Sequence, residues 1–228
     1  MSLVGDQAKQ IYGVVRNIML QPVFFPTWTV RIYLEQPSER NQYRYPPIPS
    51  NVATKLSSLP VQLFYVTAKS RELDPSLWPI LTIDDPSVNY LLVRKPTSRL
   101  SDRDAAMVHD WLDSGKALHV MRDHPDHCDS NIIAGLWGAD TKQLREVVGG
   151  SIAPLLDDSL NETHFLNQVC YLNLKGQILS HDACTVLCSE DSIAFPVSRS
   201  EHHYLGQEFG PNGEFKPDKF TMPGDMKC

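Results

Sequence analysis

The sequence predicts an α/β fold in which helices cover a mostly parallel central sheet. Three observations support this prediction. Short apolar runs alternate with amphipathic segments, some of these segments have clear end signals, and stretches rich in proline or glycine separate the elements. Strands that alternate with helices are typical of layered α/β domains. The 228-residue chain is long enough to bury its own core, so we expect one large domain.

Four apolar runs rich in β-branched and aromatic residues are expected to be strands. They cover residues 30–34, 61–66, 90–93 and 117–121. The span 36–50 contains four prolines, which exclude a regular helix or a central strand there. The residues after Gly206 are also expected to be loop-like, because glycine and proline recur among them.

Three amphipathic segments are expected to be helices. They cover residues 7–20, 102–114 and 141–148. In the clearest of them, the second, Ser101 is a candidate N-cap and Gly115 a candidate end. We expect Ala105, Val108 and Leu112 to form its buried face, because they recur at helical spacing.

Composition excludes several classes of protein. The chain has 21 basic and 27 acidic residues and a net charge of −6, so it lacks the basic face of a nucleic-acid binder. It contains no apolar run of about 18 residues, and we therefore expect no membrane span. No signal peptide is visible, and the five cysteines form no Cys-x-x-Cys pair. We expect a cytoplasmic protein whose cysteines are reduced.

Polar side chains gather where two of the expected strands end. They are Arg94, Lys95, Ser98 and Arg99 after the first of these strands, and Arg122, Asp123 and His124 after the second. Ligands of open α/β sheets bind beyond the carboxyl ends of the strands. Arginines and imidazoles at that edge suit a phosphate or diphosphate, although structural ion pairs and loop capping would also explain them. A structural zinc site here lacks a Cys-x-x-Cys partner.

Several motifs in this region resemble a family of glycosyltransferase-like proteins. The most distinctive are Met-Arg-Asp-His-Pro at 121–125 and Gly-Leu-Trp-Gly at 135–138. Asp-Trp-Leu-Asp-Ser-Gly at 110–115 also matches closely, and His-Asp at 181–182 is a weaker match. The resemblance covers residues 2 to about 210. We therefore expect a single domain over residues 1–210 and an irregular tail over residues 211–228.

The resemblance implies a GT-A fold, a Rossmann-like sandwich that binds a nucleotide-diphosphate sugar and transfers the sugar to an acceptor. Such enzymes hold Mn²⁺ or Mg²⁺ with an acidic strand-end motif. On this resemblance His181, with Asp182, would belong to the metal site. Asp123 and His124 would contact the sugar or act as acid and base, and Trp137 would stack on a sugar or base. Glu162 lies where the family often has an acidic residue near the acceptor.

The sequence departs from the family at the metal motif, where Lys95 and Thr97 replace the two acidic residues. An ammonium group repels a cation, so binding of Mn²⁺ or Mg²⁺ at this motif is expected to be lost. Two hypotheses follow. Lys95 could neutralise the diphosphate itself and allow metal-independent transfer. Alternatively, the protein has lost catalysis and keeps the fold for binding or for a structural or interaction role.

Overall fold

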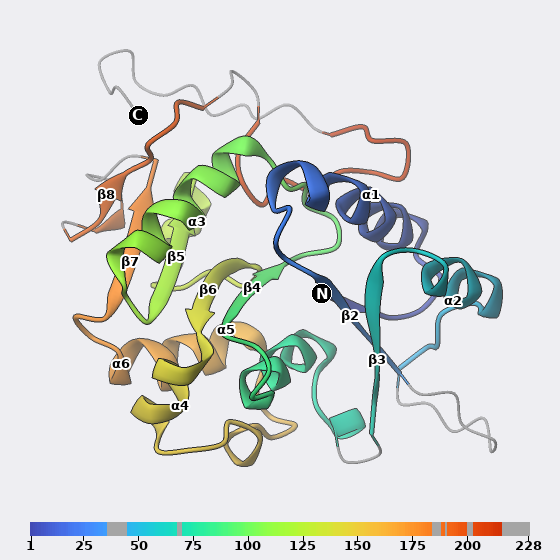
Figure 1. Ribbon diagram of the computed structural model, residues 1–228, viewed down its shortest axis with the longest axis horizontal. Helices are drawn as coiled ribbons and strands as arrows, with labels where there is room; N and C mark the ends of the chain where they lie inside the picture. Colours follow the sequence, from blue (N-terminus) through green and yellow to red (C-terminus); the bar gives the residue numbers. More distant parts are fainter. Residues whose placement is uncertain (36–44, 68–69, 184–187, 190, 200–202, 216–228) are drawn as a thin grey trace.

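The computed structural model describes residues 1–35, 45–67, 70–183, 188–189, 191–199 and 203–215. Within these ranges the chain forms a mixed α/β fold with two sheets (Figure 1). No helix among the described residues is both long and apolar enough to cross a membrane. Residues 36–44 of the expected loop, residues 216–228 of the expected tail, Cys184 and Cys228 lie outside the described ranges.

The first sheet has three parallel strands in the order β1-β2-β3. They are β1 (Ser2–Leu3), β2 (Val30–Glu35) and β3 (Val61–Val66). Helix α1 (Ala8–Phe24) connects the first two, and helix α2 (Ser50–Ser57) lies between the second and the third. Apolar side chains of these helices and strands bury one another, as in the cluster around Val14, Ile32 and Leu56.

The second sheet has five strands in the order β4-β6-β5-β7-β8. They are β4 (Tyr90–Arg94), β5 (Leu118–Arg122), β6 (Leu136–Asp140), β7 (Ile178–Asp182) and β8 (Ile193–Ala194). Strand β6 runs antiparallel to both of its neighbours, whereas β7 is parallel to β5 and β8. The α/β prediction is confirmed. The expectation of a single sheet is wrong, because the strands divide into a three-stranded parallel sheet and a five-stranded mixed sheet. In the mixed sheet β6 follows β5 without a crossover helix.

One of the expected helices begins and ends at its predicted signals, and a second ends at a glycine. Helix α3 (Asp102–Ser114) starts where the Ser101 side chain accepts a hydrogen bond from the Asp104 amide. It ends at Gly115, which has a φ of 65°. Helix α4 (Thr141–Val148) ends in the same way at Gly149, with a φ of 80°. Positive φ costs glycine little, so these glycines stop the helices.

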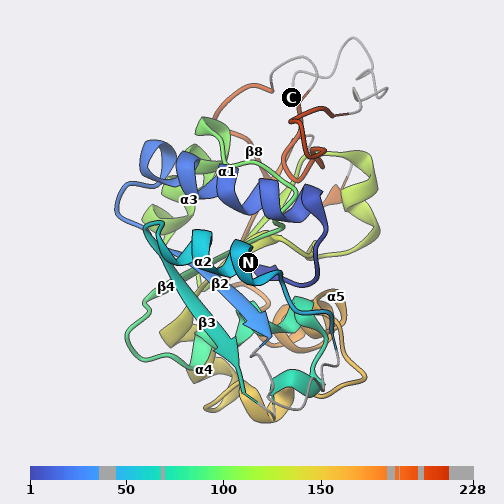
Figure 2. The same cartoon turned by 90° about the vertical axis from the view of Figure 1, so that its right-hand side faces the viewer.

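The remaining described elements are short or irregular helices. They are the 3₁₀ segments η1 (Ser70–Glu72), η2 (Pro75–Asp84), η3 (Pro125–Asp129) and η4 (Ala153–Leu155), the short helices α5 (Glu162–Phe165) and α6 (Tyr171–Asn173), and the π-helical segment Leu166–Cys170 between them. Apolar residues of η2, α4 and residues 165–174 form the largest buried cluster, against one face of the second sheet. Helix α3 and the end of α1 pack on the other face, and Figure 2 shows these layers from the side.

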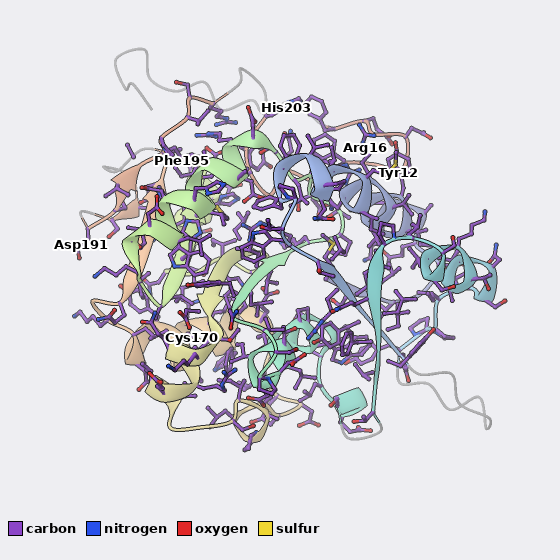
Figure 3. The ribbon with its side chains drawn as sticks, in the orientation of Figure 1. Tyr12, Arg16, Cys170, Asp191, Phe195 and His203 are labelled. Atoms are coloured by element: carbon purple, nitrogen blue, oxygen red, sulfur yellow. A yellow bond between two sulfur atoms is a disulfide. The ribbon has the colours of Figure 1, made fainter. Side chains whose placement is uncertain are left out.

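A disulfide joins Cys128 to Cys188. The expectation of reduced cysteines is therefore wrong for this pair. The two residues are 60 positions apart in sequence, but they follow the neighbouring parallel strands β5 and β7, whose carboxyl ends lie together. Cys170, labelled in Figure 3, is a buried free thiol, and burial raises its pKa to about 12.

Candidate functional site

The carboxyl ends of β4 and β5 bring together a group of polar and aromatic side chains. We call this group the strand-end cluster, and it consists of Lys95, Asp123, His124, His127 and Tyr204. The Tyr204 ring lies 4.6 Å from the His124 ring and 5.8 Å from the His127 ring, measured between centroids. Lys95 is close enough to His127 to lower its pKa electrostatically. The cluster therefore unites the ends of β4 and β5, which β6 separates in the second sheet, with a third segment from the end of the described chain.

Asp123 is the buried anion of the cluster, with no exposed side-chain surface. Its Oδ2 atom accepts hydrogen bonds from the Arg103 guanidinium and from the Leu205 amide, the latter at 2.8 Å. Its Oδ1 atom has no hydrogen-bond partner among the described residues. Burial raises the pKa of Asp123, and the neighbouring Arg103 opposes that rise. Oδ1 is thus a buried acceptor that a ligand hydroxyl or a water molecule could satisfy.

Backbone amides fix the protonated nitrogen of both histidines. The Asp123 amide donates to Nδ1 of His127 at 3.0 Å, and the Asp126 amide donates to Nδ1 of His124 at 3.2 Å. A neutral imidazole has one donor and one acceptor nitrogen, so Nε2 carries the proton in each ring. Burial, reinforced by His124 and Lys95, lowers the pKa of His127 to about 4. At neutral pH His127 is therefore an uncharged N–H donor.

Lys95 is exposed at the end of β4, and its stem lies against Gly135 just before β6. A Cβ atom at Gly135 would come within 2.6 Å of Lys95 Cγ. Gly135 also donates its amide to Oε1 of Glu162 at 2.8 Å, and the Trp137 indole donates to the same atom at 2.7 Å. Burial raises the pKa of Glu162, while these two donors and Lys95 lower it. Gly135 thus allows the lysine to lie beside a buried carboxyl group.

Two of the arginines from the sequence prediction lie inside the protein as ion pairs. Arg94 makes two hydrogen bonds to Asp104 of α3, at 3.1 and 2.7 Å, and its guanidinium also donates to the carbonyls of Val93 and Trp137. Arg122 makes two hydrogen bonds to Asp182, at 2.6 and 3.1 Å. Both arginines are buried. In this arrangement they link structural elements and do not reach the surface of the strand-end cluster.

Three further predicted residues also lie outside the cluster. Ser98 donates to the Lys95 carbonyl at 2.9 Å and closes the turn after β4. The Arg99 guanidinium turns toward α1 and lies 5.7 Å from the centre of the Tyr12 ring, which Figure 3 labels. Trp137 is completely buried in the core. Of the predicted substrate-binding residues, the structure therefore brings only Lys95 to the exposed surface beside Asp123 and His124.

The predicted metal residues, His181 and Asp182, use their donor atoms elsewhere. The two ring nitrogens of His181 lie 2.9 Å from His119 Nε2 and 2.8 Å from Asp110 Oδ2. Asp182 accepts hydrogen bonds from Arg122 and from the Ser192 hydroxyl. Neighbouring strand residues also point to opposite faces of a sheet. His181 and Asp182 thus do not fit Mn²⁺ or Mg²⁺, and the described residues contain no group of three side chains suited to a metal ion.

Sequence reasoning missed Arg103 and Tyr204. Arg103 belongs to the first turn of α3, which packs on one face of the second sheet. Its guanidinium pairs with Asp123, and its Cζ atom lies 4.2 Å from the centre of the Phe195 ring, which Figure 3 labels. An arginine in a helix usually faces solvent, and its partner lies 20 residues away, so no local pattern indicated the pair. Tyr204 belongs to the segment that was expected to precede the irregular tail. Its place over the histidines depends on tertiary structure alone.

Comparisons with known proteins do not place the chain in a family. No family model matches it, and no curated protein matches its sequence. The chemistry of the strand-end cluster must therefore follow from the geometry and charges of Lys95, Asp123 and the two histidines.

Proposed function

We propose that the protein binds a nucleotide-diphosphate sugar at the strand-end cluster and needs no metal ion to do so. One observation carries this proposal. The ammonium group of Lys95 lies near His127, whose Nε2 atom is held in the protonated form by the Asp123 amide. A charged donor and a neutral donor of this kind suit phosphate oxygens. The resemblance to GT-A glycosyltransferases, and the mixed α/β fold, support the choice of ligand.

A second observation supports the proposal that Lys95 takes the place of a metal ion. It occupies one of the positions where the resembling family carries its acidic motif, at the carboxyl end of β4. Hydrogen bonds to charged groups contribute about 1.5 to 3 kcal/mol each. A single ammonium contact to the diphosphate would therefore change the affinity by roughly 10- to 100-fold. This effect is large enough to measure in one variant.

The burial of Asp123 favours binding over rapid sugar transfer. A general base must reach the proton of the acceptor hydroxyl, within about 3 Å. Asp123 Oδ1 has no partner among the described residues, but the whole side chain is covered. If transfer occurs, Oδ1 takes the proton of the acceptor hydroxyl while Lys95 and His127 stabilise the departing diphosphate. The alternative function is a structural or interaction role without a nucleotide sugar.

Calorimetric titration with UDP, GDP and their common sugars tests the proposal. One nucleotide should bind equally well with Mn²⁺ and with EDTA. Saturation at 100 times Kd should stabilise the fold by about 2.7 kcal/mol. Lys95→Ala should weaken binding at least tenfold, whereas Lys175→Ala, at an exposed lysine after α6, should not change it. The proposal fails if no nucleotide binds, or if binding requires Mn²⁺.

A turnover assay separates transfer from binding. Release of free nucleotide diphosphate from the bound donor should be slow or undetectable in the wild-type protein. Any release that does occur should fall at least 100-fold in Asp123→Asn, because the amide cannot accept the acceptor proton as a base. If this variant releases nucleotide diphosphate as fast as the wild type, Asp123 is not the base of the reaction.

A further inference from the structure

The disulfide connects the strand-end cluster to a neighbouring loop of the second sheet. Cys128 lies in η3, directly after His127, and Cys188 lies in the loop between β7 and β8. Figure 1 shows β5, β7 and β8 side by side. The bond thus joins the segment that carries both histidines of the cluster to a segment that carries no cluster residue. The proposed function gives it no role.

Both cysteines lie beyond the ends of paired strands. The last paired residues of β5 and β7 are Arg122 and Asp182, and each cysteine follows its strand end by six residues. Arg122 makes two hydrogen bonds to Asp182, at 2.6 and 3.1 Å, and its carbonyl accepts from the Ala183 amide at 2.9 Å. These bonds keep the strand ends joined without the disulfide. Opening the disulfide should therefore free the loops but not the sheet.

The η3 segment (Pro125–Asp129) contains no buried residue. Its two imidazoles accept hydrogen bonds from amides of residues 123–126, and the His127 amide donates to the His124 carbonyl at 2.8 Å. All of these hydrogen bonds lie within residues 123–127, so they shape the segment but do not attach it to another element. The disulfide is a covalent attachment one residue away from His127. We therefore expect the positions of both imidazoles to depend on it.

Small thiols can reach this bond from solvent. Cys128 and Cys188 are both partly exposed, whereas the free thiol of Cys170 is buried. Reduction requires a thiolate to approach one sulfur of the disulfide, and exposed disulfides are therefore the labile ones. Burial raises the pKa of Cys170 to about 12, which keeps this thiol protonated and unreactive. Among the described cysteines, reduction should thus change Cys128 and Cys188 alone.

From these positions and this exposure we infer that the disulfide between Cys128 and Cys188 is a redox switch of the strand-end cluster. The closed disulfide holds His124 and His127 beside Lys95, where the cluster binds the diphosphate of a nucleotide sugar. The reduced form releases η3 and binds the same ligand weakly. This inference rests on the proposed function, because nucleotide affinity is the property that the switch controls.

The switch exchanges two electrons with thiols of the glutathione type. A glutathione thiolate attacks the sulfur of one cysteine, the S–S bond breaks, and the other cysteine leaves as a thiolate that takes a proton from water. A second glutathione thiolate then attacks the glutathione sulfur of the mixed disulfide and releases the first cysteine, which is protonated in turn. Two glutathione molecules become one glutathione disulfide, and both cysteines become thiols. Oxidation by glutathione disulfide reverses these steps.

Histidine NMR tests the structural part of the inference without any nucleotide. In the oxidised protein the ring protons of His127 should titrate with a pKa of about 4. After reduction with millimolar glutathione this pKa should move toward the ordinary value of about 6.5, because the freed segment returns the imidazole to water. The exposed His109 of α3 is the control and should titrate unchanged.

Three results of this experiment would overturn the inference. The disulfide could stay closed in glutathione, as shown by the mass of the protein after alkylation. The pKa of His127 could be the same in the oxidised and the reduced protein. Reduction could also unfold the protein, as shown by circular dichroism, and the bond would then be a structural one.

Calorimetric titration with UDP-glucose and GDP-mannose tests the functional part. The oxidised protein should bind one of them at least tenfold more tightly than the reduced protein, and glutathione disulfide should restore the affinity. The double variant Cys128→Ser, Cys188→Ser should bind weakly in both conditions, whereas Cys170→Ala should respond like the wild type. Equal affinity in both redox states would overturn the switch and leave the proposed function intact. If neither state binds a nucleotide sugar, the proposed function fails, and the His127 titration alone decides whether the disulfide controls the cluster.

Discussion

His119 and His181 face each other across the parallel strands β5 and β7, with 2.9 Å between Nε2 of the first and Nδ1 of the second. Both residues are completely buried. Trp111 stacks on His119 at a centroid distance of 5.4 Å, and Asp110 of the same helix contacts His181. Burial, followed by the nearby His181 and Arg94, lowers the pKa of His119 well below its usual value. Burial also lowers the pKa of His181, against the opposing effect of Asp110.

This pair should make the protein less stable as the pH falls below about 6.5. In the unfolded chain histidine takes up a proton near pH 6.5, whereas in the folded protein His119 stays neutral to a lower pH. The unfolded state then binds more protons, so the free energy of unfolding decreases with falling pH. Each such histidine contributes about 1.4 kcal/mol per pH unit within this window.

Urea unfolding between pH 7.5 and 5 measures the effect. The variant His119→Gln keeps a polar group beside His181 but does not titrate, so its stability should depend less steeply on pH than that of the wild type. His109→Gln changes an exposed histidine of α3 and should leave the slope unchanged. Equal slopes for the wild type and His119→Gln would show that His119 does not stay neutral in the folded protein.

Arg103 and Asp123 form a second link between α3 and the sheet, and both are buried. Arg103→Gln leaves the Asp123 carboxylate without its cation and should cost about 3 to 5 kcal/mol of stability. Because the loss comes from an uncompensated charge, Arg103→Gln combined with Asp123→Asn should cost less than the sum of the single changes. Denaturant unfolding of the three variants measures this coupling. Additive losses would mean that the two side chains do not interact.

Local signals in the sequence predicted the elements that local interactions determine. The ends of α3 follow from Ser101 and Gly115, which act within one helical turn, and these predictions are confirmed. The strand β6 was missed because Leu136–Asp140 contains a glycine and no β-branched residue. Its antiparallel place between β4 and β5, and the division into two sheets, depend on contacts that no sequence window contains.

The buried face of α3 shows why the site was only partly predictable. Apolar spacing predicted Ala105, Val108 and Leu112, of which the structure buries Val108 and partly buries the other two. It also buries Arg103 and Asp104. These charged residues face inward because each forms a buried ion pair with the sheet. Asp104 pairs with Arg94, and Arg103 pairs with Asp123. Polar partners far apart in sequence leave no periodic pattern. Lys95, Asp123 and His124 were found because they directly follow strands, a position that sequence does indicate.

Gly135 supports the lysine of the strand-end cluster, and Gly135→Ala should test this support. The residue has a φ of 76°, where a side chain costs about 1 to 2 kcal/mol, and the new Cβ would also collide with Lys95 Cγ. Gly149→Ala is the matched control, because its φ of 80° is similar and no atom lies within 4 Å of the new Cβ. Both variants should lose stability, measured by thermal unfolding. Only Gly135→Ala should weaken nucleotide binding. Equal nucleotide affinities of the two variants would show that the position of Lys95 does not affect binding of the ligand.

The disulfide between Cys128 and Cys188 holds the segment that carries His124 and His127 against the segment after β7. It closes a loop of about 60 residues, for which the loss of unfolded-chain entropy predicts a contribution of about 4 kcal/mol. Reduction with dithiothreitol should therefore lower the free energy of urea unfolding by about 2 to 4 kcal/mol. The double variant Cys128→Ser, Cys188→Ser should have this lower stability already and should not respond to the reductant. Cys170→Ala keeps the disulfide, so its unfolding should still respond; a response in the double serine variant would assign the effect to another cysteine.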